Sequence, residues 1–227
     1  MPTLPGIDLW DMWPLQRRDG TIADIDGGQI WFTLSAPIVG GPNERHSPAR
    51  IRLLSHRDNG WTDLGPALPD QFGPGNREWS GSAIIDDDGL VRLFYTAAGN
   101  RGEVGGFRQR LVATSARLDT GMAQTRPAGW SPPVEIIVAD GRNYRIVDQR
   151  DGALGTTQAF RDPGYFRDPA DGQSYLVFTG SLANSASAHD GCIGIARALD
   201  DDLMTWALLP PIVTADGLNN ELERPHI

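Results

Sequence analysis

The stretch SAIIDDDGLVRLFYT, residues 82–96, decides the fold class of this chain. Two β-rich runs, 82–85 and 91–96, flank the turn sequence Asp86-Asp87-Asp88-Gly89. Apolar and β-branched residues on both sides of an Asp/Gly turn are typical of a β-hairpin. The sequence therefore predicts two antiparallel strands here, joined by an acidic, solvated turn rather than by a metal site.

The alternation of short strands and turns continues on both sides of this hairpin. A second hairpin is predicted around the turn Asp168-Pro169-Ala170-Asp171-Gly172. No segment keeps a helical stripe of apolar residues for more than about two turns. Evenly spaced strands without helices are typical of an all-β propeller or sandwich. Further strands are predicted at 29–35, 50–55, 109–113, 164–166, 174–179 and 192–196.

Composition and charge exclude several classes of protein. The chain has 227 residues, enough for one substantial domain, and its 27 Gly and 17 Pro favour turn-rich β structure. With 20 basic and 29 acidic residues, the formal net charge is −9. This charge argues against nucleic acid or an anionic membrane as a partner, whereas a neutral sugar is compatible. Residues 1–5 lack the features of a signal peptide, and no window is apolar enough to span a membrane.

Three acidic residues stand in unusual settings that suggest a glycoside-processing site. Asp11 lies in LWDMWPLQ, Asp162 in FRDP and Glu223 in ELERPH. Such chemistry needs one carboxylate to attack the anomeric carbon and one carboxyl to protonate the leaving oxygen. Read alone, each motif is more typical of a turn or capping residue. Their joint occurrence, in this order, indicates a function.

Together the motifs resemble the levansucrase and inulosucrase family, glycoside hydrolase family 68. Its members carry Trp-Asp-x-Trp-Pro-Leu, Glu-Trp-Ser-Gly-Ser, Arg-Asp-Pro and Glu-Arg-Pro segments, found here at 10–15, 78–82, 161–163 and 223–225. The resemblance implies a five-bladed β-propeller and so favours the propeller over the sandwich. Because relatives continue further, we expect residues 1–227 to form a single incomplete propeller domain of about three blades plus the start of a fourth. On its own, such a chain is expected to have little or no sucrose activity.

The resemblance also implies catalytic roles for the three acids. Asp11 would be the nucleophile, and Glu223 the general acid that protonates the departing glucose oxygen and later deprotonates the acceptor. Asp162 would accept hydrogen bonds from the fructosyl hydroxyls. A proton on Glu223 requires surroundings that are rich in acid and closed to bulk water on that side.

Further residues are implied to bind the substrate. Trp10 and Trp79 would line the fructosyl subsite, with Ser80 near the nucleophile. Arg161 and Glu221 would contact the glucosyl or acceptor side.

The motif Arg-Asp-Pro occurs twice, at 161–163 and at 167–169. The first copy enters a predicted strand, whereas the second opens the predicted turn at 168–172. We therefore assign Asp162 to the site and Asp168 to the turn.

The expected reaction is a double displacement on sucrose through a covalent fructosyl-enzyme, with transfer of fructose to a fructan chain or to water. An invertase-like β-fructofuranosidase of the related family 32 is an alternative, but the chain lacks that family's Asn-Asp-Pro-Asn motif and has Glu-Arg-Pro where that family has Glu-Cys. A noncatalytic carbohydrate-binding fragment is a second alternative. By resemblance, the protein would be extracellular, with sucrose and fructan acceptors as partners and no nucleic acid or membrane.

No cofactor or metal is expected. Many Gram-positive relatives hold calcium with an Asp directly before the Glu-x-Glu-Arg motif, and Asn220 stands there in this chain. The four histidines are too scattered for a zinc pattern. Cys192 is the only cysteine and is interpreted as a small buried thiol, or as half of a disulfide whose partner lies outside the chain.

Overall fold

The computed structural model of the chain describes residues 2–41, 44–58, 60–103, 106–121, 124–147 and 157–227. Their regular structure consists of 13 β-strands and one short 3-10 helix, η1 (Glu44–His46). No α-helix occurs in this described part. The prediction of an all-β chain is therefore confirmed.

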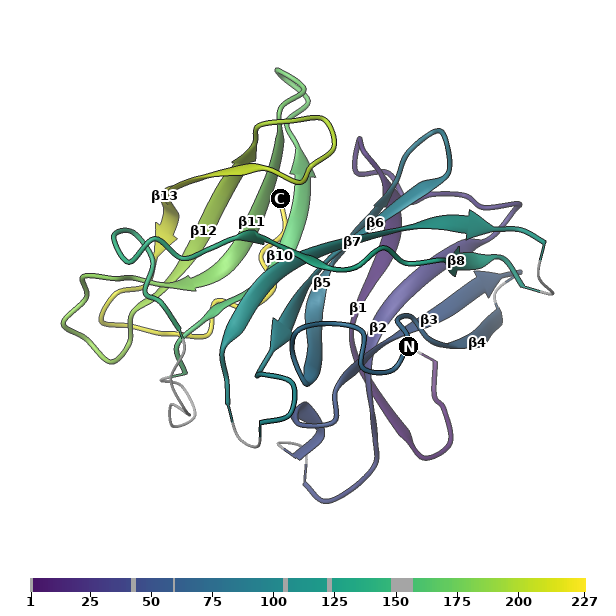
Figure 1. Cartoon of the computed structure of the whole chain (residues 1–227), viewed down its shortest axis with the longest axis horizontal. Coiled ribbons are helices and arrows are strands. Elements are labelled where there is room, and N and C mark those ends of the chain that lie inside the picture. Colours follow the sequence, from purple (N-terminus) through teal and green to yellow (C-terminus); the bar gives the residue numbers. More distant parts are fainter. Residues whose placement is uncertain (1, 42–43, 59, 104–105, 122–123, 148–156) are drawn as a thin grey trace.

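The strands form three antiparallel units that follow one another along the chain (Figure 1). The first unit contains β1 (Ile7–Arg17), β2 (Gln29–Pro37), β3 (Arg50–Arg57) and β4 (Gly60–Pro66). The second contains β5 (Arg77–Ile85), β6 (Leu90–Ala98), β7 (Gln109–Asp119), β8 (Arg126–Ala128) and β9 (Val134–Ile137). The third contains β10 (Phe160–Arg167), β11 (Ser174–Ser181), β12 (Gly191–Ala198) and β13 (Trp206–Thr214). Neighbouring strands pair in sequence order, as in propeller blades, except that β8 and β9 both pair with β7.

The first strands of the three units lie side by side. The end of β1 pairs in parallel with β5, where Leu15 faces Ala83. On its other side β5 contacts β10, because Ser82 Oγ donates to the carbonyl of Pro163 at 2.8 Å and accepts from the amide of Tyr165 at 2.9 Å. Figure 1 accordingly shows β5 between β1 and β10. Side chains on these three strands can therefore meet at one place.

Both predicted hairpins are present. The β5–β6 turn closes with the amide of Gly89 donating to the carbonyl of Asp86 at 3.0 Å. Gly89 has a φ of 79°, a left-handed conformation that favours glycine. The β10–β11 turn begins at Asp168, whose amide donates to the carbonyl of Gln173 at 2.9 Å. The assignment of Asp168 to this turn is therefore right.

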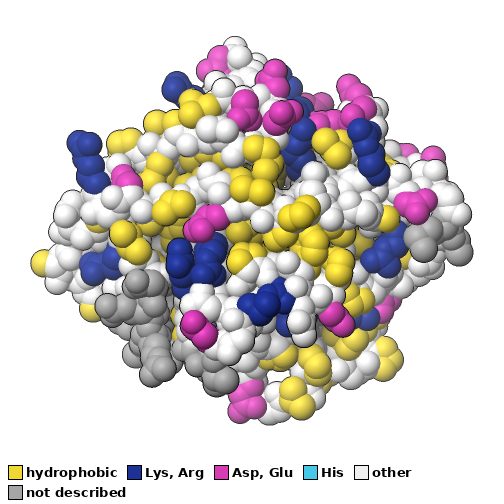
Figure 2. All heavy atoms as spheres, viewed as in Figure 1, with side chains coloured by type: hydrophobic (Ala, Val, Ile, Leu, Met, Phe, Trp, Pro, Cys, Tyr) yellow, Lys and Arg dark blue, Asp and Glu magenta, His cyan; other side chains and the backbone are white. Residues whose placement is uncertain are grey.

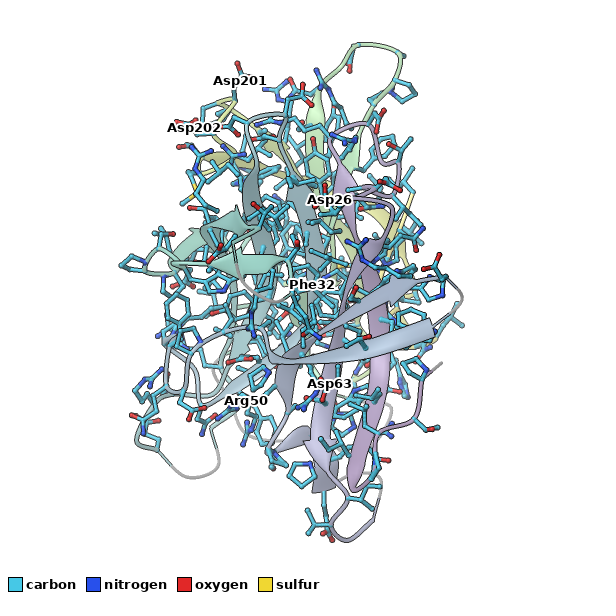
Figure 3. The ribbon with its side chains drawn as sticks, turned by 90° about the vertical axis from the view of Figure 1, so that its right-hand side faces the viewer. Asp26, Phe32, Arg50, Asp63, Asp201 and Asp202 are labelled. Atoms are coloured by element: carbon cyan, nitrogen blue, oxygen red, sulfur yellow. The ribbon has the colours of Figure 1, made fainter. Side chains whose placement is uncertain are left out.

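The core consists of two apolar layers, one on each face of the second unit. Leu93 belongs to the layer shared with the first unit, which includes Phe32. Phe94, the next residue along β6, belongs to the layer shared with the third unit, which includes Phe178. Successive side chains of a strand point to opposite faces, so one strand serves both layers. Figure 3 shows Phe32 well inside the molecule.

Cys192 lies in the second of these layers and is fully buried. Burial raises the pKa of its thiol to about 12. The predicted burial of Cys192 is confirmed.

The acidic turn of the β5–β6 hairpin differs from the prediction at one residue. Asp86 is not solvated, because it accepts hydrogen bonds from both Arg18 and Arg92 and its side chain is only 17% exposed. Burial alone would raise the pKa of Asp86, but the two arginines hold it below its usual value. The other two acids of this turn, Asp87 and Asp88, are exposed as expected. Asp201 and Asp202, in the β12–β13 connection, are also exposed and lie at the outer end of the molecule (Figure 3).

Candidate active site

The first strand of each unit is interrupted by a bulge, and each bulge contains a polar residue. The pairing shifts between Trp10 and Met12, between Trp79 and Gly81, and between Arg161 and Gly164. A bulge redirects a side chain out of the regular alternation of its strand. The residues inserted at these three points are Asp11, Ser80 and the pair Asp162-Pro163.

The backbone at these bulges has an unusual conformation. Asp11 and Asp162 have φ angles of 51° and 60°, in the left-handed region that residues with side chains seldom adopt. Such conformations are typical of functional sites, where the surrounding fold holds them in place. Next to Ser80, Gly81 approaches the carbonyl oxygen of Phe94 so closely that an added Cβ would lie 1.9 Å from it. Glycine is therefore required at this bulge.

Asp11 has a partner on each carboxylate oxygen. Ser80 Oγ donates to its Oδ2 at 2.6 Å, and Arg224 Nη1 lies 3.3 Å from its Oδ1. Arg224 also donates from Nη2 to the carbonyl of Met12 at 2.9 Å. The side chain of Asp11 remains 31% exposed. The carboxylate is thus oriented by hydrogen bonds while part of it stays open to a ligand.

Asp162 is buried beside this carboxylate. Its amide donates to Thr96 Oγ1 at 2.8 Å, and Thr96 Oγ1 donates in turn to the carbonyl of Ser80 at 3.3 Å. Burial raises the pKa of the Asp162 carboxyl to about 7. Arg161, whose Nε lies 3.6 Å from Asp162 Oδ2, opposes this rise, whereas the nearby Glu223 and Asp11 add to it.

Glu223 joins the same cluster from the C-terminal segment, which runs beside β10 and β11 (Figure 1). Its Oε1 accepts a hydrogen bond from Arg161 Nη2 at 3.0 Å. Arg161 therefore lies between the carboxylates of Asp162 and Glu223. The side chain of Glu223 is 58% exposed. The expectation of a side closed to bulk water is thus not met in this chain.

Two tryptophans and the helix η1 form the next part of the site. Arg45 lies over the ring of Trp10 with its guanidinium carbon 4.6 Å from the ring centroid, and His46 meets the same ring edge-on. Trp79 Nε1 donates to the carbonyl of His46 at 3.3 Å. Trp10 is buried under these groups, and Trp79 is partly buried.

Arg45, His46 and Thr96 were not predicted from the sequence. The pKa of His46 is lowered by burial and by Arg45, while Glu223 and Asp11 oppose that change, so its imidazole shares the electrostatic surroundings of the acids. No motif or residue spacing in the sequence identifies these residues, because η1 comes into contact with Trp10 only in the folded chain.

The remaining predicted substrate residue, Glu221, is half-buried two positions before Glu223. Its amide donates to Asn219 Oδ1 at 3.1 Å. Within the described residues, no group of three or more His, Cys, Asp or Glu side chains could hold a metal ion. None of the described elements is a helix of the length and apolarity needed to traverse a bilayer.

Fold and site together define a β-propeller protein with an acid- and arginine-rich cluster at its innermost strands. The chain belongs to glycoside hydrolase family 68, the levansucrase/invertase family, whose model matches residues 3–190 and 181–227. The predicted family membership and the propeller are thereby confirmed.

Individual relatives agree with this membership. The levansucrase of Rahnella aquatilis is 30% identical over 96% of this chain and 60% of the relative. The extracellular sucrase of Zymomonas mobilis is also 30% identical, over 96% of this chain and 58% of the relative. The chain thus spans about 60% of the length of these curated relatives.

Solved structures show the same fold. The inulosucrase from Halalkalicoccus jeotgali bound to kestose superimposes with a TM-score of 0.88 at 35% identity, over 98% of this chain and 57% of that protein. The β-fructofuranosidase catalytic domain of Microbacterium saccharophilum gives a TM-score of 0.83 at 25% identity, over 100% of this chain and 58% of that domain.

Proposed function

We propose that the chain carries the catalytic acids of a sucrose-dependent fructosyltransferase of the levansucrase or inulosucrase type. The observation that carries this proposal is the convergence of Asp11, Asp162 and Glu223, from three distant parts of the sequence, around Arg161 and Arg224. Levansucrases and an inulosucrase among the relatives support sucrose as the fructosyl donor and fructan as an acceptor. The extracellular sucrase among them supports secretion.

The first half of the reaction forms a covalent intermediate. Asp11 attacks the anomeric carbon of the fructosyl unit and forms a bond to it as the bond to the glucosyl oxygen breaks. The hydrogen bond from Ser80 Oγ fixes one oxygen of Asp11 and thereby orients the other for attack. Glu223 transfers its proton to the departing glucosyl oxygen, and glucose is released.

The second half transfers the fructosyl group. Glu223, now a carboxylate, removes a proton from a fructan hydroxyl or from water, and that oxygen displaces Asp11 from the anomeric carbon. Two displacements at one carbon retain its configuration. With a fructan acceptor the polymer grows, and with water free fructose is the product.

Asp162 binds the fructosyl unit rather than reacting with it. A buried carboxylate that accepts hydrogen bonds from sugar hydroxyls stabilises positive charge as it develops on the ring. Trp10 and Trp79 line the same subsite, while Arg161 and Glu221 lie toward the glucosyl or acceptor side. Hydrogen bonds donated by the sugar hydroxyls stabilise the ionised form of Asp162. They offset part of the cost of burying that charge.

Hydrolysis is the second candidate activity. The similarity to a β-fructofuranosidase from Microbacterium saccharophilum favours it as a competing outcome at the same site. Both outcomes use the same three acids and differ only in the acceptor. A carbohydrate-binding role without catalysis is the remaining alternative.

Because the chain spans about 60% of its curated relatives, sucrose turnover tests these candidates in a version of the chain extended by the C-terminal segment of a relative. Glucose is released in both activities, whereas free fructose appears only on hydrolysis, so the two sugars are measured together. The variant Asp11→Ala should abolish glucose release, because no nucleophile remains, and Glu223→Ala should nearly abolish it. The matched control Asp168→Ala, in the β10–β11 turn, should leave it largely intact. Unchanged glucose release by Asp11→Ala would exclude the proposed mechanism, and sucrose binding without glucose release by the extended protein with all three acids intact would favour the noncatalytic role.

A further inference from the structure

Asn220 is a fully buried residue in the otherwise accessible segment that leads to Glu223. Its side-chain amide makes two hydrogen bonds to the connection before β12. Asn220 Oδ1 accepts from the amide of Asp190, and Nδ2 donates to the carbonyl of Ala188 at 2.8 Å. One side chain thus satisfies a donor and an acceptor of the neighbouring backbone.

The backbone on either side of this contact is fastened to the third unit. The amide of Gly191 donates to the carbonyl of Asn219 at 2.9 Å, and Thr179 Oγ1 donates to the carbonyl of Leu222 at 2.9 Å. A Cβ at Gly191 would lie 2.4 Å from the carbonyl oxygen of Asn219, so the two segments are in close contact. The residues before Glu223 are therefore held by β11 and by the start of β12.

An ion pair supports the surface on which Asn220 lies. Asp190 is buried, and its Oδ2 lies 3.0 Å from Arg145 Nε. The amide of Arg145 donates to the carbonyl of Ser181, at the end of β11, at 2.8 Å. Asp190, whose amide donates to Asn220 Oδ1, is thus itself held against the third unit.

Glu223 needs this support because its own side chain is not held by burial. It is 58% exposed and contacts Arg161 through one carboxylate oxygen. The next residue, Arg224, has a φ of 51° and reaches Asp11. The placement of both residues therefore depends on how the backbone before them is anchored.

We propose that Asn220 is a positioning residue that fixes the segment carrying Glu223, so that the acid meets the leaving group of the substrate. This inference rests on the proposed function. An amide side chain is required, because a carboxylate could accept from Asp190 but could not donate to Ala188, and would bring a second buried charge next to Asp190. Alanine would leave both backbone groups unpaired.

A pair of substrates separates positioning of the acid from general damage. Sucrose needs a proton on its leaving oxygen, whereas β-fructosyl fluoride releases fluoride without one. The variants Asn220→Ala and Asn220→Asp should therefore lower kcat/KM on sucrose about 100-fold, mainly through kcat, and on β-fructosyl fluoride by less than about threefold. The control Asn184→Ala removes an exposed asparagine that makes one hydrogen bond to the carbonyl of Arg142, and both rates should stay unchanged.

Hydrogen exchange measured on the same proteins gives a readout that does not depend on turnover. Amides of residues 219–224 should exchange faster in Asn220→Ala, while those of β11 and β12 keep their protection. Equal losses on both substrates, or unchanged exchange of 219–224, would overturn the proposal. If the extended protein with Asn220 intact turns over neither substrate, the proposed function fails, and the exchange measurement alone then decides whether Asn220 anchors the segment.

Discussion

At the residue scale, the site is built from side chains that the fold holds in unfavourable conformations or surroundings. Asp162 is the clearest case, since it is a buried carboxyl with a left-handed backbone, and the nearby acids Asp11 and Glu223 further disfavour its ionisation. Its amide is bonded to Thr96, so the position is fixed even though ionisation is costly. The residue is suited to bind a ligand that brings hydrogen-bond donors with it.

The raised pKa of Asp162 predicts a specific dependence of stability on pH. The folded-state pKa of about 7 lies above the ordinary aspartate value of 3.8, so the folded protein binds the proton more tightly than the unfolded chain. The contribution of Asp162 to the free energy of unfolding should therefore fall as the pH rises from about 4 to 7, by up to roughly 4 kcal/mol. Urea unfolding of Asp162→Asn should lack this component, so the variant gains stability relative to the parent protein across that range. A constant difference between the two proteins at all pH values would contradict the assigned cause.

Ser80 allows a second prediction at this scale. Ser80→Ala removes the 2.6 Å hydrogen bond that orients Asp11 without opening a large cavity. A hydrogen bond to a charged group is worth about 1.5–3 kcal/mol, so kcat/KM on sucrose should fall about 10- to 100-fold with little change in thermal stability. Ser115→Ala, on β7 and away from the acids, is the control and should keep full activity. Full activity of Ser80→Ala would remove the orienting role.

At the element scale, the strands that the sequence predicts are those with Val, Ile and aromatic runs. The hairpin of β5 and β6 was predicted because runs of apolar and β-branched residues flank an Asp/Gly turn. β1 was missed, since Asp11 and Pro14 interrupt its pattern, and β13 was missed because it contains Pro210 and Pro211. The bulges that aim the acids could not be predicted, because a bulge depends on the partner strand as much as on its own residues.

The bulge next to Ser80 can be tested through Gly81. In Gly81→Ala the new Cβ would lie 1.9 Å from the carbonyl oxygen of Phe94, so β5 and β6 have to separate. We expect a loss of more than about 2 kcal/mol in the free energy of unfolding, together with loss of activity. Gly89→Ala is the control, because its Cβ meets nothing within 4 Å and only the positive φ of 79° opposes it. That variant should lose about 1 kcal/mol. Denaturant unfolding measures the loss in free energy of unfolding for both variants. Equal losses would show that separation of β5 and β6 is not the cause of the destabilisation in Gly81→Ala.

At the scale of the whole molecule, the sequence motifs indicated which residues meet, but not how the units are joined. Asp11, Asp162 and Glu223 were predicted as a set from their motifs, whereas the contacts that bring them together are long-range. These contacts include the parallel pairing of β1 with β5 and the hydrogen bonds of Ser82 to β10. They have no local sequence signal, because each depends on two segments that are far apart in the chain.

Arginine side chains make many of the hydrogen bonds that join these segments. The sequence contains no lysine, so all 20 basic residues are arginines. Several arginines donate hydrogen bonds from their guanidinium groups to backbone carbonyls of another segment. Arg126, on β8 of the second unit, donates in this way to the carbonyls of Leu64 and Pro66 on β4 of the first unit. The planar, multidentate guanidinium suits this use better than an ammonium group. Figure 2 shows arginine and acidic side chains together near one end of the molecule, the end at which Figure 3 labels Asp201 and Asp202.

Asp86 links all three units at that end. It pairs with Arg18, just beyond β1, and with Arg92 on β6, while Arg18 Nη2 also donates to the carbonyl of Asp201 at 2.8 Å in the β12–β13 connection. Asp86→Asn should lower the free energy of unfolding by about 3 kcal/mol, because it leaves the buried Arg92 with only the exposed carboxylate of Asp202, 4.0 Å away, as a counterion.

The lowered pKa of Asp86 determines how the stability loss in Asp86→Asn depends on pH. The folded-state pKa of Asp86 is lowered, so its stabilisation is present above the unfolded value near 4 and is lost as the pH falls through the lower folded value. The deficit of Asp86→Asn should therefore be full at pH 7 and shrink in acid. Asp87→Asn, at a fully exposed position in the same turn where the partner Arg17 lies 3.6 Å away, should leave the free energy of unfolding nearly unchanged. Equal effects of the two variants in urea unfolding at pH 7 would show that the Asp86 cluster does not hold the three units together, and that the apolar layers between them suffice.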